Sequence, residues 1–326
     1  MLRFLTRRTL GAAVILVIIA AVTFFLFFAI PADPARLACG KVCPPETLAQ
    51  ARHNLGFDQP IFVQFVNWLV GVFVGRDYEG LGHCPAPCLG YSFVNHAPVF
   101  DTITDRMPLT ISLTVGSAVI FLLFGVGTGI IAALNQGRPL DKIASVSSLI
   151  GASVQIYFVG TLAMYFLVYQ WHVIERPQYV PFTDNPLQWA YGLLLPWVVL
   201  AIIFTANYTR MARSTMVEQL SEDYVRTARA KGMSGRTVVL RFALRGTLTP
   251  IATIFGIDIG TLIGGAIITE NTFSLQGIGR LSIQAVLNSD LPMLMATVLL
   301  AATAIVVFNV VVDAMYAVID PRVRLS

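Results

Sequence analysis

The sequence predicts an all-α, polytopic membrane protein with six transmembrane helices, and three observations support this. Hydrophobic residues make up 56% of the 326 residues and charged residues only 12%, which is about half the charged share of a typical soluble domain. Lipid must therefore cover much of the surface that water covers in a soluble protein. Several long stretches of the chain carry no charge. Most of the Lys and Arg residues lie in every second segment between these stretches, as expected if those segments share one side of a membrane.

Each of the six apolar stretches is long enough to cross a bilayer, which takes about 20 residues. The predicted spans are Leu10–Ile30, Leu109–Leu134, Ile143–Gln170, Trp189–Thr209, Pro250–Thr269 and Leu291–Val312. Only the fifth contains a charged residue, Asp258. The first span follows three arginines, as a signal peptide would. Its apolar core is too long and no small-residue cleavage site follows, so we interpret it as an uncleaved span.

The distribution of basic residues predicts the orientation. With the N-terminus inside, 15 of the 22 Lys and Arg residues fall in the inner segments and seven in the outer ones. The longest inner connection, residues 209–249, alone holds eight of them. The positive-inside rule therefore predicts that both termini are cytoplasmic.

This orientation divides the chain into three parts: residues 1–30 with the first span, an extracytoplasmic segment 31–108, and a core 109–326 with five spans. Within the outer segment, Ile61–Gly75 is apolar but too short to span. We expect a helix on the membrane surface with Trp68 near the headgroups. A buried helix in a small extracellular cap is the alternative.

All four cysteines lie in the outer segment, in two closely spaced pairs. The pairs are Cys39 with Cys43 and Cys84 with Cys88. An even number of cysteines in an oxidising compartment indicates disulfides, and three connectivities are possible. A bridge between the pairs would restrain more chain than bridges within them. A zinc site is the rival interpretation, because His83 and His96 are nearby. We expect disulfides and no metal.

Other chemistry has little support in the sequence. It contains no G-x-x-x-x-G-K-[ST] phosphate loop and no G-x-S-x-G nucleophile elbow. We therefore expect no catalytic residue and no cofactor on this chain. The basic residues follow a membrane pattern, so nucleic acid is not an expected partner. Asp258 alone is weak support for a proton relay. Gly256, Gly260 and Gly264 have a spacing that predicts close packing of a neighbouring helix.

The inner connection 209–249 is predicted to hold two short helices. Ser221 has the character of an N-cap, Glu222 and Arg226 have the spacing of an ion pair, and Gly232 can end the first helix. The second helix is expected to begin at Ser234 and to end at Arg245, before Gly246. Thr249 and Pro250 would then begin the fifth span.

Small apolar residues lie between the charges of the first predicted helix. They are Tyr224, Val225, Ala228 and Ala230, which would offer a small apolar surface. A connection that only fixes topology or binds anionic lipid needs no such order. We therefore predict that the connection docks a soluble partner.

Residues 222–232 (EDYVRTARAKG) resemble the EAA loop of ABC-importer permeases, in the form used by the dipeptide/oligopeptide family. Thr227, Ala228 and Gly232 fall on the small-residue and glycine positions of that motif. Arg226 replaces its usual Glu, and Arg245 its closing Pro. The resemblance extends to Leu55–Pro60, Leu89–Ser92, Arg106–Thr110, Glu270–Arg280 and Asp320–Arg324, and so covers nearly the whole chain.

This resemblance implies the type I ABC-importer permease fold and a B-type permease subunit of the bacterial inner membrane. It implies three kinds of partner besides the lipid bilayer: a second homologous permease that completes a heterodimer, two ATP-binding subunits or one fused ATPase, and an extracytoplasmic substrate-binding protein. ATP and Mg would bind to the ATPase subunits. The implied cargo is a di- or oligopeptide. Nickel chelates, haem, glutathione or sugars are alternatives within the family, and an ion-gradient-driven carrier is the alternative outside it.

The resemblance also implies which residues act. In the family, this loop forms a coupling helix that inserts into a cleft of the ATPase. The predicted coupling residues are Glu222, Asp223, Tyr224, Ala228, Arg229, Ala230, Lys231 and Gly232. For the translocation pathway we name Ser153, Gln155, Tyr157 and Asp258, each of which is equally suited to hydrogen bonding between helices.

Overall fold

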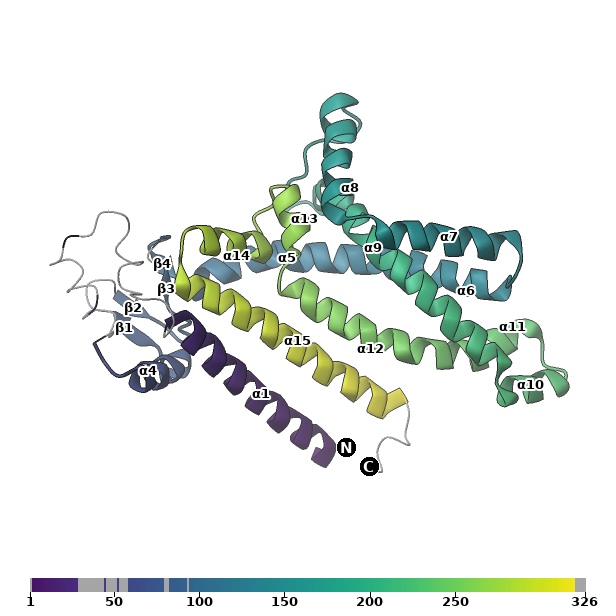
Figure 1. Ribbon diagram of the computed structural model, residues 1–326, viewed down its shortest axis with the longest axis horizontal. Helices are drawn as coiled ribbons and strands as arrows, with labels where there is room; N and C mark the ends of the chain where they lie inside the picture. Colours follow the sequence, from purple (N-terminus) through teal and green to yellow (C-terminus); the bar gives the residue numbers. More distant parts are fainter. Residues whose placement is uncertain are drawn as a thin grey trace.

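The computed structural model describes residues 2–28, 44, 52, 58–78, 82–92 and 94–319, and these are helical apart from turns and two short hairpins (Figure 1). In this part of the chain, five helices are long and apolar enough to cross a membrane. A sixth crossing is present if one sharply bent pair of helices is counted as a span. The predicted all-α membrane protein is confirmed.

The first and last long helices lie side by side and run in opposite directions (Figure 1). These are α1 (Leu2–Phe28) and α15 (Leu291–Ile319). Arg8 Nη1 lies 3.0 Å from Asp313 Oδ2 and joins the two near the chain termini. The start of α1, the end of α15 and the short helix α10 (Asp223–Ala230) lie toward one end of the molecule. The helix α4 (Ile61–Val74) and the hairpins lie at the other.

The glycine row predicted to seat a helix packs α12 (Leu244–Ile263) against α15. A Cβ atom on Gly260 would lie 2.7 Å from Ile305 Cα, and one on Gly264 would lie 2.6 Å from Ala301 Cβ. Only glycine permits this close approach of the two backbones. The predicted packing role is confirmed.

Two continuous helices form the centre of the bundle. The first consists of α5 (Val99–Phe121), a π-helical turn Leu122–Val126 and α6 (Gly127–Leu134). The second is α9 (Pro186–Ser221). A Cβ on Gly129 would lie 2.6 Å from the Thr209 carbonyl oxygen, so α6 and α9 also pack closely.

The third predicted span, Ile143–Gln170, is not one straight helix. It consists of α7 (Pro139–Ser153) and, after a bend of 92°, α8 (Ile156–Ala163) followed by a π-helical turn Met164–Gln170. Val154 and Gln155, between the two helices, have extended backbone. α7 lies along α9, whereas α8 leaves the direction of α7 and packs against α13 and the first part of α9 (Figure 1).

Two short helices, α13 (Ile267–Thr272) and α14 (Ile278–Leu287), follow the fifth span. A buried carboxylate, that of Glu270, joins them to α5. It accepts hydrogen bonds from Thr110 Oγ1 (2.9 Å) and from the backbone N–H of Arg280 (3.0 Å). The carboxyl group of Glu270 is therefore held at the N-terminus of α14.

The outer segment contains the predicted helix α4, but Trp68 does not face outward. It is 7% exposed, packs among side chains of α1 and α15, and donates from Nε1 to the Leu89 carbonyl (3.2 Å). Trp68 therefore faces the bundle, where α4 forms part of a small packed cap, and the expected position of α4 at the membrane surface stays a prediction. Phe62 and Phe73, on other faces of α4, are exposed.

Two antiparallel hairpins complete this cap. β1 (Arg76–Tyr78) pairs with β2 (Gly82–Cys84), and β3 (Tyr91–Ser92) pairs with β4 (Ala97–Pro98). Cys84 forms a disulfide with Cys88, so the bridge lies within the second pair. Cys39 and Cys43 lie outside the described residues.

Candidate functional site

The helix α10 (Asp223–Ala230) occupies most of the segment that resembles a coupling helix, and its start differs from the prediction. Ser221 is the last residue of α9, and its Oγ donates to the Glu218 carbonyl (2.7 Å). The predicted cap at Ser221 is wrong because the hydroxyl bonds back into its own helix. Glu222 occupies the N-cap position without a side-chain capping bond. Arg226 Nη1 lies 3.7 Å from Asp223 Oδ1, in place of the predicted pair with Glu222.

The end of α10 is built as predicted. Gly232 has φ +78°, a left-handed conformation that favours glycine. Its N–H donates to the Arg229 carbonyl (2.9 Å), and the N–H of Met233 donates to the Ala228 carbonyl (3.3 Å). This pair of bonds is the Schellman arrangement that satisfies the last carbonyls of a helix. The chain direction after α10 is thereby fixed.

One face of α10 is packed against the protein itself. Val225 is fully buried and Ala228 is 4% exposed. They form a small core with residues of three other helical segments: Ala133, Met216, Val238 and Ala243. The apolar surface predicted for Val225 and Ala228 is therefore turned inward, because these two positions lie on one side of the helix, three residues apart. This core holds α10 in a fixed position on the bundle.

The opposite face of α10 is exposed and polar. The exposed predicted coupling residues are Glu222, Asp223, Tyr224, Arg229, Ala230, Lys231 and Gly232. The Tyr224 hydroxyl donates to Gln219 Oε1 of α9. Burial and then the neighbouring Glu222 carboxylate raise the pKa of Tyr224, so the hydroxyl keeps its proton and remains a donor at neutral pH.

The second predicted helix does not end at Arg245. It begins, as predicted, with the Ser234 Oγ accepting from the Thr237 N–H (3.4 Å). It then continues as α11 (Gly235–Thr237), a π-helical turn Val238–Ala243 and α12, with Pro250 inside the helix. Neighbouring groups in a membrane bundle compensate for the hydrogen bond that proline lacks, so Thr249 and Pro250 need not begin a span. Gly246 lies within the helix, next to the end of the Gln219 side chain.

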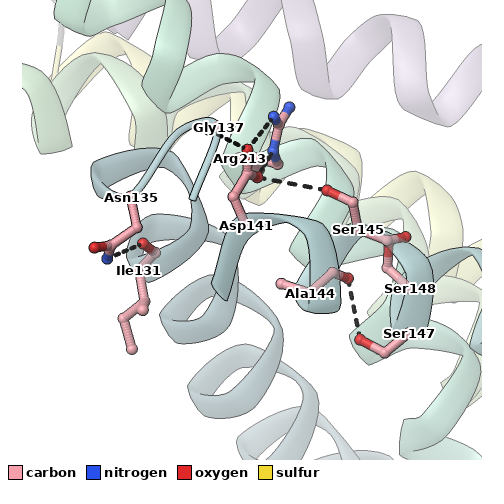
Figure 2. A network of polar contacts seen from close by, with 9 residues as sticks. All are labelled: Ile131, Asn135, Gly137, Asp141, Ala144, Ser145, Ser147, Ser148 and Arg213. Atoms are coloured by element: carbon pink, nitrogen blue, oxygen red, sulfur yellow. Dashed lines mark hydrogen bonds and ion pairs between the residues drawn. The ribbon is translucent and has the colours of Figure 1, made fainter. Parts of the chain in front are cut away.

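A network around the buried Asp141 joins the start of α7 to α9 (Figure 2). Asp141 forms a two-bond ion pair with Arg213: Nε of the arginine bonds Oδ1, and Nη2 donates to Oδ2 at 2.9 Å. Oδ2 also accepts from the N–H of Gly137 (2.9 Å) in the α6–α7 turn. This site is not among the residues that the sequence pattern predicts. An acid in the first turn of α7 was the only local signal, because the arginine lies 72 residues away.

The four predicted pathway residues fall in two places. Ser153, Gln155 and Tyr157 are exposed and flank the break between α7 and α8. Ser153 Oγ donates to the Leu149 carbonyl of its own helix (2.8 Å). Asp258 accepts from the Tyr208 hydroxyl of α9 (2.8 Å) and so bonds between helices.

No metal-binding group of three His, Cys, Asp or Glu residues is formed within the part of the chain that the structure describes. The candidate site consists of the short helix α10, its exposed polar face and the ion pair between Asp141 and Arg213.

Two family profiles match the chain. Residues 1–114 match the N-terminal region of binding-protein-dependent transport system membrane components, and residues 125–325 match the inner membrane component of such systems.

Curated relatives match along nearly the full length. A putative peptide transport system permease protein of Brucella abortus (strain 2308) is 36% identical over 324 residues, covering 99% of both chains. A probable peptide ABC transporter permease protein of Sinorhizobium fredii is 32% identical, covering 98% of this chain and 99% of that protein. The glutathione transport system permease protein GsiC of Salmonella typhimurium is 35% identical, covering 99% of both.

Among solved structures, a chain of the MetNI methionine ABC transporter is similar in fold. The TM-score is 0.54 at 16% identity, covering 68% of this chain and 97% of that chain. Together these matches show that the chain is a multi-pass membrane protein of the family of binding-protein-dependent transport system inner membrane components.

Proposed function

We propose that this chain is the permease subunit of an ATP-driven importer of di- or oligopeptides, and that α10 docks on a separate ATP-binding subunit. The observation that carries the proposal is the construction of α10. Its apolar face is buried in the bundle, its polar face is exposed, and its C-terminal end is fixed by the backbone hydrogen bonds of Gly232 and Met233. A loop that only connected two spans would not need this construction.

The exposed residues Glu222, Arg229 and Lys231 would contact the ATPase, and Val225 and Ala228 would pass displacement of α10 to the bundle. A helix suits this role because its internal hydrogen bonds let it move as one body. ATP and Mg would remain on the ATPase subunits. The energy for movement would come from nucleotide binding that differs between two states of the complex.

The arrangement of helix ends supports an orientation with both termini in the cytoplasm. The start of α1, the end of α15 and α10 lie toward one end of the molecule (Figure 1). That end also carries most of the basic residues, as the positive-inside rule requires of a cytoplasmic side. A second, homologous permease, two ATPase subunits or one fused ATPase, and an extracytoplasmic binding protein complete the proposed transporter.

The break between α7 and α8 supports a pathway near Ser153, Gln155 and Tyr157. Backbone that leaves a helix at membrane depth is stable only where it is buried in protein or lines an aqueous cavity. These side chains are exposed in the single chain, so water or a second permease is expected beside them. Asp258 fits an interhelical bond better than a pathway role, because the Tyr208 hydroxyl already occupies it.

The proposed cargo rests on relatives that are named for peptide transport. Glutathione is the leading alternative, because a glutathione permease is equally similar over the same length. Nickel chelates, haem and sugars remain family alternatives. A carrier driven by an ion gradient is the alternative from another class.

Reconstitution distinguishes these functions. The chain is co-expressed with its proposed partners, purified through a tag on the permease and placed in proteoliposomes with the binding protein. We expect ATPase subunits to co-purify in a fixed ratio and uptake of a labelled peptide to require ATP. Uptake driven by an ion gradient without an ATPase would contradict the proposal. Competition with a panel of peptides and glutathione then identifies the cargo.

A further inference from the structure

The ion pair between Asp141 and Arg213 lies between the two parts of the molecule that the proposed function connects. Arg213 belongs to α9, whose last residue, Ser221, is followed directly by Glu222 and α10. Ser221 follows Arg213 by eight positions in the helix, a distance of about 12 Å at 1.5 Å per residue. Asp141 belongs to α7, whose other end is the break before α8.

The geometry of the pair fixes one helix on the other. The guanidinium of Arg213 meets the carboxylate of Asp141 through two nitrogen atoms, so both the separation and the angle of the groups are set. Asp141 is only 4% exposed. The N–H of Gly137 bonds to the same carboxylate, and Ser145 Oγ lies 3.5 Å from it. The α6–α7 turn, the start of α7 and α9 therefore meet at one charged group (Figure 2).

A second contact holds α7 along α9. A Cβ on Gly151 would lie 3.1 Å from Ala206 Cβ. α7 is thus attached near both of its ends, by an ion pair at Asp141 and by close packing at Gly151. Beyond Gly151, Val154 and Gln155 have extended backbone, which has no helical hydrogen bonds to keep α8 aligned with α7.

Opening the ion pair is costly at its Asp141 end. The Asp141 carboxylate is buried and would be left poorly solvated without its cation, whereas the Arg213 side chain is 30% exposed and keeps access to water. The pair is therefore expected to persist while the surrounding helices move. Movement of α9 would then carry α7 with it, and the change in angle would occur at the break.

We propose that Asp141 and Arg213 are positioning residues that make α7, α9 and α10 one lever, which carries movement of the coupling helix to the α7–α8 break. This rests on the proposed function, because it requires that α10 be moved by an ATPase. It adds to that function the path from the docking site to the residues at the break, Ser153 and Gln155.

The test uses the complete reconstituted transporter and measures peptide taken up per ATP hydrolysed. The variants are Asp141→Asn, Arg213→Gln, Arg213→Lys and the double variant Asp141→Asn with Arg213→Gln. The matched control is Arg210→Gln, because Arg210 lies on the same helix but bonds only to Asn207 of its own helix (3.1 Å) in the described contacts.

We expect each neutral single variant to lower uptake per ATP roughly fivefold or more, the usual range of coupling between sites. ATP hydrolysis without substrate should remain. The double variant should be no worse than either single variant, since both remove one interaction. Arg213→Lys should be intermediate, because lysine keeps the charge without the two-bond geometry. Arg210→Gln should match the unsubstituted complex.

Uptake per ATP that is normal in the single variants would overturn the proposal, as would an equal loss in Arg210→Gln. If the neutral variants do not accumulate in the membrane, Arg213→Lys decides: a lowered ratio in the assembled complex supports the proposal and a normal ratio overturns it. Failure of the proposed function itself would appear in the unsubstituted complex, as an absence of ATP-dependent uptake.

Discussion

Gly232 ends α10 in a left-handed backbone conformation, and it also lies on the proposed docking surface. It has φ +78°, and a Cβ placed on it would meet no atom within 4 Å. Substitution there is therefore strained by the backbone and not by crowding. For a residue other than glycine, this conformation costs about 1–2 kcal/mol.

Replacing Gly232 by valine is expected to displace the end of α10, because a β-branched residue strongly disfavours the left-handed conformation. Uptake should fall and ATP hydrolysis should become uncoupled from it, while the amount of protein in the membrane stays unchanged. Gly232→Asn should be milder, since asparagine adopts this conformation more readily. Gly235→Val, at a nearby open position, is the control. Normal uptake by a normally expressed Gly232→Val variant would contradict the prediction.

Local sequence rules predict the structure correctly at some residues of the site and fail at others. Gly232 was predicted as the helix end, because few other residues accept its backbone conformation. Ser221 was wrongly predicted as a cap, because a serine hydroxyl bonds equally well to the preceding turn of a helix. The partner of Asp141 was not predictable at all, since Arg213 comes close only after α7 and α9 have packed.

At the scale of one element, the helix α10 has a buried face and an exposed face. Ala228 is buried against the bundle and Ala230 is exposed. The prediction that Ala228 contributes to coupling is therefore best understood as a role in seating the helix, whereas Ala230 lies on the face available to a partner.

Leucine at each of these alanines should separate the two roles. Ala228→Leu overfills a packed core, which typically costs about 1–3 kcal/mol, and should lower the unfolding temperature of the purified chain in detergent. Ala230→Leu should leave that temperature unchanged and weaken co-purification of the ATPase. Equal effects of the two variants on stability would contradict the assignment of the faces.

The packing of α12 on α15 gives a second prediction at this scale. Gly260→Leu is expected to separate the two helices, because even a Cβ would approach Ile305 Cα to 2.7 Å. The chain should accumulate poorly or unfold at a lower temperature. Gly127→Leu, at a helical glycine whose Cβ would meet nothing within 4 Å, should be tolerated. Equal tolerance of both variants would show that this contact is unimportant.

The elements also show what hydropathy can and cannot predict. The position of each long apolar stretch was predictable, because lipid exposure requires it. The 92° bend within Ile143–Gln170 is not predictable in this way, since no charged residue or proline interrupts the stretch. Likewise Gly246 and Pro250 predict the end of one helix and the start of another, but the single helix α12 continues through both.

At the scale of the whole molecule, the outer cap and α10 lie toward opposite ends (Figure 1). The proposed orientation therefore predicts opposite labelling of two exposed positions in intact cells. A cysteine introduced by Phe73→Cys should react with a membrane-impermeant thiol reagent. One introduced by Ala230→Cys should react only after permeabilisation. The unsubstituted chain, with its four native cysteines, provides the background, and the reverse pattern would contradict the orientation.

The central claim is that the exposed face of α10 is the docking surface for an ATP-binding subunit. Its most direct test is site-specific photocrosslinking in the co-expressed complex, with a photoreactive amino acid at Ala230 and, as the control, at Phe73. We predict a crosslink to the ATPase from position 230 and none from position 73. Efficient incorporation at position 230 without a crosslink to the ATPase, or a crosslink from position 73, would contradict the account.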